Sequence, residues 1–372
     1  MQFDLVKKFA EKLRNSAPAR EILQLAAVLA AGKACVLLAV FLYRPSAGFF
    51  HLLSTQWDAG HYQAIAAQGY TSYWFHVFSP VFPGLIKGLS YIIPSPWVSA
   101  FIITNVLSFI FPVVLYKAFN FRAALLAELF PTYLVFTTIP YSDIVSLVLL
   151  ALTILLLLKN RIIAASATVS LAIMNSFNLA WTLPSYLFIL LEKKKYRNLL
   201  FCVLPGIAGL LILIWFRWKT GDFWTYLQLE REVWKVHFTD PVSQIIWLFK
   251  VGDEWFAHVK YNIFGFKQVT VYWVIRNLVF EAFYIIGLVK LFRMRDNFSF
   301  FLGVYCIAAI LPLLFLSGTP VLSVPRLLLA AFPVFLGYAA MLNKGRHYYI
   351  YGGVCLALGA VIGIIQTYSF FA

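Results

Sequence analysis

The stretch YSDIVSLVLLALTILLLL, residues 141–158, decides the class of fold, because no charged side chain interrupts it between Asp143 and Lys159. Apolar runs recur along the whole chain, at about 22–43, 77–93, 97–116, 121–139, 141–158, 162–191, 198–216, 269–292, 299–316, 326–343 and 348–368. A helix needs about 20 apolar residues to cross the hydrocarbon core of a bilayer. The runs therefore predict an all-α polytopic membrane protein with about ten or eleven membrane segments.

The composition excludes a water-soluble globule. Of the 372 residues, 62% are hydrophobic and 12% are charged, and the mean hydropathy is +0.82. An ordinary soluble domain has about 45–50% apolar and about 25% charged residues. The apolar runs leave little room for a soluble domain, so we expect one integral membrane domain over residues 1–372.

The excess of basic residues predicts the orientation of the chain in the membrane. Thirty basic and 15 acidic residues give a net charge of +15. The basic residues cluster in short gaps between apolar runs, as in cytoplasmic loops, which argues against nucleic acid as a partner. The clusters are Lys159/Arg161, Lys193–Lys195, Arg293/Arg295 and Lys344/Arg346. If they lie inside with the N-terminus, outer loops fall at about 44–76, 217–268 and 317–325.

The first apolar run is expected to remain in the protein. It begins near Ile22, is long enough to span, and is not followed by a small-residue cleavage site, unlike a signal peptide. The protein is thus expected to be a multi-pass protein of a prokaryotic plasma membrane, or of the endoplasmic reticulum membrane if it is eukaryotic.

Two apolar runs need breaks to satisfy this orientation. The run at 162–191 must enter and return, and its polar middle, Asn175-Ser176-Phe177-Asn178, predicts a broken pair of short helices. The three runs between the outer loop at 44–76 and Asp143 give an odd number of crossings. Either the prolines in 77–93 keep that run from spanning, or Pro131 splits the run at 121–139 into two half-helices.

The first candidate catalytic residue is Asp58, just after the first apolar run in Gln56-Trp57-Asp58-Ala59-Gly60-His61-Tyr62. Helical spacing places Asp58 on one face with His61, Tyr62 and Ile65. A carboxylate there can act as a general base towards a hydroxyl. Asp58 also suits the N-cap of a helix, and these residues alone leave both interpretations open.

Two further charges lie at predicted helix ends. Asp143 stands where one apolar run ends and the next begins, either as a cap facing water or as a residue lining a cavity. Arg326, in Ser323-Val324-Pro325-Arg326, is at an outer helix end, where the positive-inside rule does not require it. Its forked donors can bind a phosphate, whereas snorkelling or an ion pair is the alternative.

Several common catalytic motifs are missing from the sequence. It contains no Gly-rich phosphate loop, HExxH, GxSxG or metal-ligand His/Cys cluster, and its four cysteines have no CxxC spacing. We therefore expect no metal and no cofactor. The interleaved aromatic and charged residues from Gly221 to Asp240 suit a carbohydrate or headgroup cleft, or an amphipathic helix in the membrane interface.

The string Trp57-Asp58-Ala59-x-x-Tyr62-x-x-Ile65-Ala66-x-x-Gly69-Tyr70 resembles the first outer loop of the PIG-V-type (phosphatidylinositol-glycan class V) mannosyltransferases, in the GT-C superfamily. Further segments follow in the family's order. Phe78–Pro83 resembles the Phe-Pro-x-x-Pro segment of the family, and Pro140–Asp143 resembles its Tyr-Ser-Glu motif. Gly221-Asp222, with Gln228 and Trp234, resembles its Gly-Asp…Gln…Trp loop. Val324–Arg326 resembles its late Pro-Arg motif. The resemblance extends to about residue 340.

The resemblance implies a GT-C-like bundle and a glycosyltransferase. One sugar, expected to be mannose, passes with inversion from a polyprenyl-phosphate donor to a hydroxyl of a lipid-linked glycan or glycolipid acceptor on the outer face. By the same resemblance, Asp58 takes the acceptor proton and Arg326 holds the donor phosphate. Asp143 stands where the family has Glu, and the expected substrate-binding set also includes Trp57, His61, Tyr62, Tyr141, Asn178 and Gln228.

One segment departs from the family. Its Arg-Pro-Asn-Gly-like element has no equivalent in Asn175–Asn178, which lacks the Arg and the Gly. Two other functions stay open. One is a transporter or flippase of lipid-linked sugars, with the charged residues as ligands at depth. The other is a non-catalytic membrane scaffold with this fold.

Overall fold

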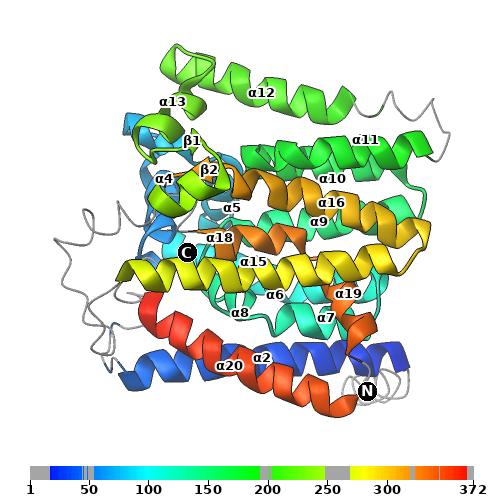
Figure 1. The fold of residues 1–372 in the computed structure, drawn as a ribbon. Helices are drawn as coiled ribbons and strands as arrows, with labels where there is room; N and C mark the ends of the chain where they lie inside the picture. The colour runs from blue at the N-terminus through cyan, green and yellow to red at the C-terminus, as the bar shows by residue number, and fades with distance from the viewer. Residues whose placement is uncertain are drawn as a thin grey trace, which may run out of the picture.

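The protein is a bundle of helices, seen here in a computed structural model that describes residues 17–43, 45, 48, 54–192, 201, 203–247, 269–318, 323–342 and 344–366 (Figure 1). The predicted basic cluster Lys193–Lys195, most of 44–53, and residues 248–268 and 319–322 of the predicted outer loops lie outside this range.

The elements follow one another as mostly helical segments. In chain order they are α2 (Ala17–Tyr43), α4 (Asp58–Gln68), η1 (Tyr73–Val77), α5 (Val81–Ser90), α6 (Pro96–Ala118), α7 (Phe121–Glu128), α8 (Pro131–Phe136), α9 (Asp143–Leu158), α10 (Ile162–Asn175), η2 (Phe177–Thr182), α11 (Leu183–Glu192), α12 (Val203–Thr220), α13 (Thr225–Glu232), β1 (His237–Phe238), α15 (Val269–Arg293), α16 (Asn297–Leu314), β2 (Leu316–Ser317), α18 (Val324–Leu327), η4 (Leu328–Ala331), α19 (Val334–Met341) and α20 (Gly345–Gln366). The η elements are 3-10 helices.

The helices define an all-α polytopic membrane fold. Within the described ranges, five helices are long and apolar enough to cross a bilayer: α2 from Pro18, α6, α12, α16 and α20. A sixth crossing is formed if Val324–Ala331 and Val334–Met341, which bend by 77°, count as one span. By this criterion, five or six of the ten or eleven expected membrane segments are long enough to cross alone, and several other apolar runs in the described ranges fold as shorter helices.

Breaks within the apolar runs account for the difference. The run at 77–93 yields η1 and the 10-residue helix α5, which is about 15 Å long, half the thickness of the hydrocarbon core. The run at 121–139 is split before Pro131 into α7 and α8. The first run is thus too short to span as one helix, and the second is interrupted at Pro131. The predicted broken pair at 162–191 is confirmed as α10 and α11, joined by η2.

The elements that carry the candidate site gather at one end of the bundle. α4, α13, α18 and the short sheet of β1 and β2 lie together there, whereas the N-terminal end of α2 and the C-terminal ends of α15 and α19 lie at the other (Figure 1). β1 pairs antiparallel with β2, with His237 opposite Ser317. α9 leads from Asp143 towards Lys159 over 16 residues, about 24 Å. The described basic clusters thus lie far from the site, as the orientation expected from charge requires.

A buried lysine connects three helices beneath the site. Lys33 of α2 donates to Asn105 Oδ1 (2.8 Å) and Ser108 Oγ (2.7 Å) of α6 and to the Thr137 carbonyl oxygen (2.6 Å) at the end of α8. A lysine inside an apolar helix is costly unless its donors are all used, as they are here. This network anchors the chain just before Pro140–Asp143.

Candidate active site

Asp58 is the first residue of α4 and does not cap it. The N-cap is Trp57, with φ 55° and ψ −137°, and no side-chain cap bond forms. The N-cap alternative for Asp58 is therefore wrong, although an acid in the first turn is still favoured by the helix dipole. A positive φ is costly for a bulky residue such as Trp. The strained turn orients the Asp58 carboxylate towards α18, 268 residues further along the chain.

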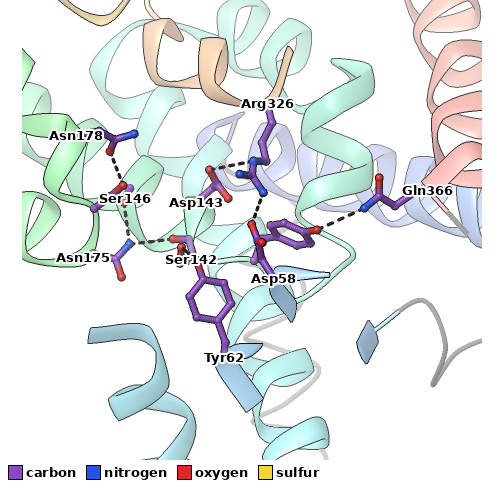
Figure 2. A network of polar contacts seen from close by, with 11 residues as sticks. Asp58, Tyr62, Ser142, Asp143, Ser146, Asn175, Asn178, Arg326 and Gln366 are labelled. Carbon is purple, nitrogen blue, oxygen red and sulfur yellow. Dashed lines mark hydrogen bonds and ion pairs between the residues drawn. The ribbon is translucent and has the colours of Figure 1, made fainter. Parts of the chain in front are cut away.

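Arg326 joins the two candidate acids. Its Nη1 lies 2.9 Å from Asp58 Oδ2, and its Nε lies 3.8 Å from Asp143 Oδ1 (Figure 2). The side chains are 11% exposed for Arg326, 13% for Asp58 and 24% for Asp143, so the group is shielded from water but reachable. The ion-pair alternative for Arg326 is thus present. An arginine held in this way can exchange one carboxylate for a phosphate of the same charge.

Aromatic rings hold the guanidinium from the inner side. Its central carbon lies 4.9 Å from the ring centre of Tyr141 and 5.8 Å from that of Phe136, within the range of cation–π attraction. The Tyr141 hydroxyl accepts from Gln366 Nε2 at 3.4 Å, at the end of α20 (Figure 2). Tyr141 therefore supports Arg326 from below.

Hydrogen bonds fix the chain around Asp143. The hydroxyls of Tyr62 and Ser142 share a bond of 2.6 Å. Asn175 Nδ2 donates to the Ser142 carbonyl oxygen (3.0 Å) and to Ser146 Oγ (2.8 Å), as Figure 2 shows. α4, α9 and α10 are thereby tied together beneath the carboxylate of Asp143, which is the first residue of α9 after the N-cap Ser142.

These side chains line a polar cavity of about 160 Å³ that adjoins an apolar one. Its walls include Asp58, Tyr62, Asp143, Asn178, Glu230 and Arg326. The adjoining cavity, of about 500 Å³, shares Asp143, Glu230 and Arg326 with it and continues between leucines of α9 and α16. A third cavity, of about 280 Å³, shares Leu150 with the second and extends to Leu157. From Asp143 to Leu157 the lining follows α9 for about 21 Å.

Four of the expected binding residues are not among those that line this cavity: Trp57, His61, Gln228 and Tyr141, which contacts Arg326 instead. The His61 ring packs 4.6 Å from Trp74, and burial lowers its pKa more than the charge of Asp58 raises it. Gln228 accepts from the Tyr73 hydroxyl (3.3 Å) and donates to Asp222 Oδ2 (2.5 Å), which braces the start of α13. Trp57 is 40% exposed at the start of α4.

Two residues of the cavity wall were not singled out from the sequence. Glu230 and Tyr226 are four residues apart on α13, so they share one helix face, and both line the polar and the apolar cavities. Burial, with the charge of Asp58, raises the pKa of Glu230 to about 7 against the opposing hydrogen bond from Tyr226. The i, i+4 spacing of a phenol and an acid was the available signal, but it is also typical of an interfacial helix.

The comparisons with known proteins bear on the fold. No protein-family model matches the sequence, and no curated protein matches it. Among solved structures, the chain is similar to the crystal structure of ArnT from Cupriavidus metallidurans in the apo state, with a TM-score of 0.53 at 14% identity. The match covers 90% of this chain and 62% of the ArnT chain.

The likeness shows that this chain has a fold similar to that of ArnT. At this identity the match speaks for the fold alone. It does not reach the PIG-V-type family, and membership in that family stays a proposal.

Proposed function

We propose that the whole chain acts as one GT-C glycosyltransferase domain, which transfers a sugar from a polyprenyl phosphate to a hydroxyl of a lipid-linked acceptor. The observation that carries the proposal is the position of Arg326, between Asp58 and Asp143, where a polar cavity meets an apolar one. Transfer from a lipid phosphate needs a base, a cation for the leaving phosphate and an apolar path for the lipid. These three features adjoin here.

The apolar cavities suit the lipid part of the donor. A polyprenyl chain lies in the bilayer, and an apolar cavity lets it reach Arg326 without exposing its apolar surface to water. With the first isoprene units along α9 and α16, the phosphate lies at the level of Arg326 and the sugar in the polar cavity. Binding through the lipid explains how a site without a nucleotide-binding loop can hold an activated sugar.

The proposed reaction is a single displacement at the anomeric carbon. Asp58 accepts the proton of the acceptor hydroxyl, whose oxygen forms the new bond from the face opposite the phosphate. The bond from the anomeric carbon to the phosphate oxygen breaks, and its electron pair stays on the phosphate beside Arg326. The configuration at the anomeric carbon is therefore inverted. General-base assistance of this kind contributes about 10²–10⁴-fold.

The resemblance to PIG-V-type enzymes supports mannose as the sugar and a lipid-linked glycan or glycolipid on the outer membrane face as the acceptor. Tyr62, Asp143 and Asn178 are proposed to contact the sugar from the cavity wall, and Tyr141 to act through Arg326. Trp57, His61 and Gln228 are proposed to contact the acceptor as it enters, since they lie beside the cavity.

The test uses the purified protein in detergent with decaprenyl phosphomannose and a panel of glycolipid acceptors. We expect transfer with inverted anomeric configuration, read by NMR of the product, and its loss in Asp58→Asn and Arg326→Ala. Glu232→Gln, at an exposed acid of α13, is the matched control. Equal transfer by Asp58→Asn and the wild type would exclude Asp58 as the base. Failure with every acceptor, together with counterflow of the donor in liposomes, would identify a transporter instead.

A further inference from the structure

We propose that Glu230 is a further substrate-binding residue of this site, which as a neutral carboxylic acid donates a hydrogen bond to the sugar phosphate of the donor. The inference rests on the proposed function, because it assigns a residue to the donor that this function requires. The proposed function assigns the general base to Asp58 and phosphate binding to Arg326, and it gives Glu230 no role.

The position of Glu230 is the first support. It lines the polar cavity with Asp58 and the apolar cavity with Leu147, and so stands at their junction together with Arg326. A donor with its lipid in one cavity and its sugar in the other places its phosphate at that junction. Glu230 belongs to α13, whereas the ion pair is formed by residues of α4 and α18.

The local structure holds the side chain in place. The neighbouring Leu229 is 1% exposed, and its burial holds α13 against the rest of the molecule. The Val236 N–H donates to the Glu230 carbonyl oxygen (2.9 Å), and β1, directly after it, pairs with β2. Tyr226, one turn earlier on the same helix face, opposes the effect of burial on the Glu230 pKa. The protonated Glu230 carboxyl group carries an O–H that can donate to a ligand in the cavity.

The charges in the cavity explain why the neutral form matters. Arg326 carries one positive charge and already faces the two carboxylates of Asp58 and Asp143. A third carboxylate would leave an excess of two negative charges where a phosphate must enter. Burial and the charge of Asp58 favour the proton on Glu230 and raise its pKa to about 7. The protonated acid removes this repulsion and adds a donor.

Other groups near α13 set the controls for any dependence on pH. The titratable and charged residues that line the polar cavity with Glu230 are Asp58 and Tyr62 from α4, Asp143 from α9, Arg326 from α18 and Tyr226 from α13 itself. Two further elements, η1 and α12, pack on α13. They carry Tyr73, His76, Arg217 and Lys219. Burial lowers the pKa of His76, which keeps its ring neutral above pH 7. The loss of the Glu230 proton is the change that we expect near pH 7, and the Glu230→Gln variant tests it.

The direction of the pH effect on donor binding follows from the raised pKa of Glu230. Glu230 has a raised pKa, so its protonated form is complete below about pH 6 and is lost as the pH rises through about 7. Donor binding is expected to weaken over the same interval. A polyprenyl phosphosugar is a phosphodiester, whose single charge does not change between pH 5.5 and 8.5, so the ligand does not contribute to the change.

The test measures the Kd of decaprenyl phosphomannose without acceptor, and its KM in transfer, from pH 5.5 to 8.5. For the wild type we expect the Kd to rise at least about tenfold between pH 6 and 8.5. Glu230→Gln keeps a neutral donor, and we expect its Kd to match the wild type at pH 6 and to stay flat up to pH 8.5. Glu230→Ala loses the donor, and we expect binding about tenfold weaker at pH 6. Glu232→Gln is the control on the same helix and keeps the pH dependence of the wild type.

The outcomes separate this proposal from the function on which it rests. If the wild type binds and transfers but its Kd is independent of pH, or if Glu230→Gln keeps the alkaline loss or binds as weakly as Glu230→Ala, the Glu230 assignment is overturned and the transfer stands. If the wild type neither binds nor transfers the sugar at any pH, both are overturned. Thermal unfolding of each variant shows whether lost binding is only lost folding.

Discussion

Replacing Asp58 by Asn is expected to have opposite effects on binding and on chemistry. In the structure, the Asp58 carboxylate contacts Arg326 Nη1, the nitrogen that is proposed to bind the donor phosphate. The phosphate must therefore displace Asp58 before it binds, and the same displacement frees the carboxylate to act as a base. Asn cannot take a proton from the acceptor and holds the guanidinium less strongly.

The size of each effect follows from the geometry. The contact between Arg326 and Asp58 is 2.9 Å long, and the two side chains are 11% and 13% exposed, which is short and sheltered enough for a charged hydrogen bond. Such a bond contributes about 1.5–3 kcal/mol, which corresponds to about 10- to 150-fold in a binding constant. Because Asn still accepts one hydrogen bond, we take the lower end and expect about tenfold tighter donor binding. Transfer should fall by about 10²–10⁴-fold.

The assay compares the Kd for decaprenyl phosphomannose with the rate of transfer under saturating donor. Glu232→Gln removes one negative charge from an exposed position of α13 and controls for general electrostatics. If Asp58→Asn binds the donor no more tightly than this control, Asp58 does not compete with the phosphate for Arg326. A normal melting temperature is required, since Asp143 is left as the remaining partner of the arginine.

Three further predictions concern other parts of the molecule. Arg326→Lys keeps the charge but loses the fork that reaches both carboxylates, so the donor KM should rise about tenfold or more in steady-state assays, and an unchanged KM would contradict the phosphate role. Lys33→Met leaves three acceptors, two of them in buried hydrogen bonds, without their donor and should destabilise the fold by about 2–4 kcal/mol, seen as a lower melting temperature in detergent. Gly337→Ala places a methyl group against the carbonyl oxygen of Gly287, where α19 crosses α15, and should cost about 1–3 kcal/mol, whereas Gly353→Ala, which points into open space, should leave the melting temperature unchanged.

Much of the fold could be predicted because apolar periods and breaks are local properties of the chain. The polar residues at Asn175–Asn178 marked the break between α10 and α11, and Pro131 marked the start of α8. Hydropathy did not show which runs form one long helix, because an apolar run does not reveal how far its helix continues. The helix of 77–93 begins only at Val81, after the 3-10 turn of η1.

The sequence predicted those site residues whose charge is unusual at their position in a membrane protein. Asp58, Asp143 and Arg326 were singled out because few charged residues occur outside the basic loops, and the structure brings these three together. Glu230 was not singled out, because an acid in an interfacial helix is ordinary until a cavity is found beside it. His61 lies on the same helix as Asp58, but its ring packs against the aromatic rings of Trp74 and Phe78.

By itself, the sequence determined the solvent of this protein, its all-α membrane fold and the few charges that topology does not require, since hydropathy and charge are sums over neighbouring residues. Only the tertiary structure decided that Arg326 meets Asp58 across 268 residues, that Glu230 faces the same cavity, and that a polar pocket opens onto an apolar one. Such contacts depend on how α4, α9, α13 and α18 pack, and packing between distant helices leaves no periodic trace in the chain.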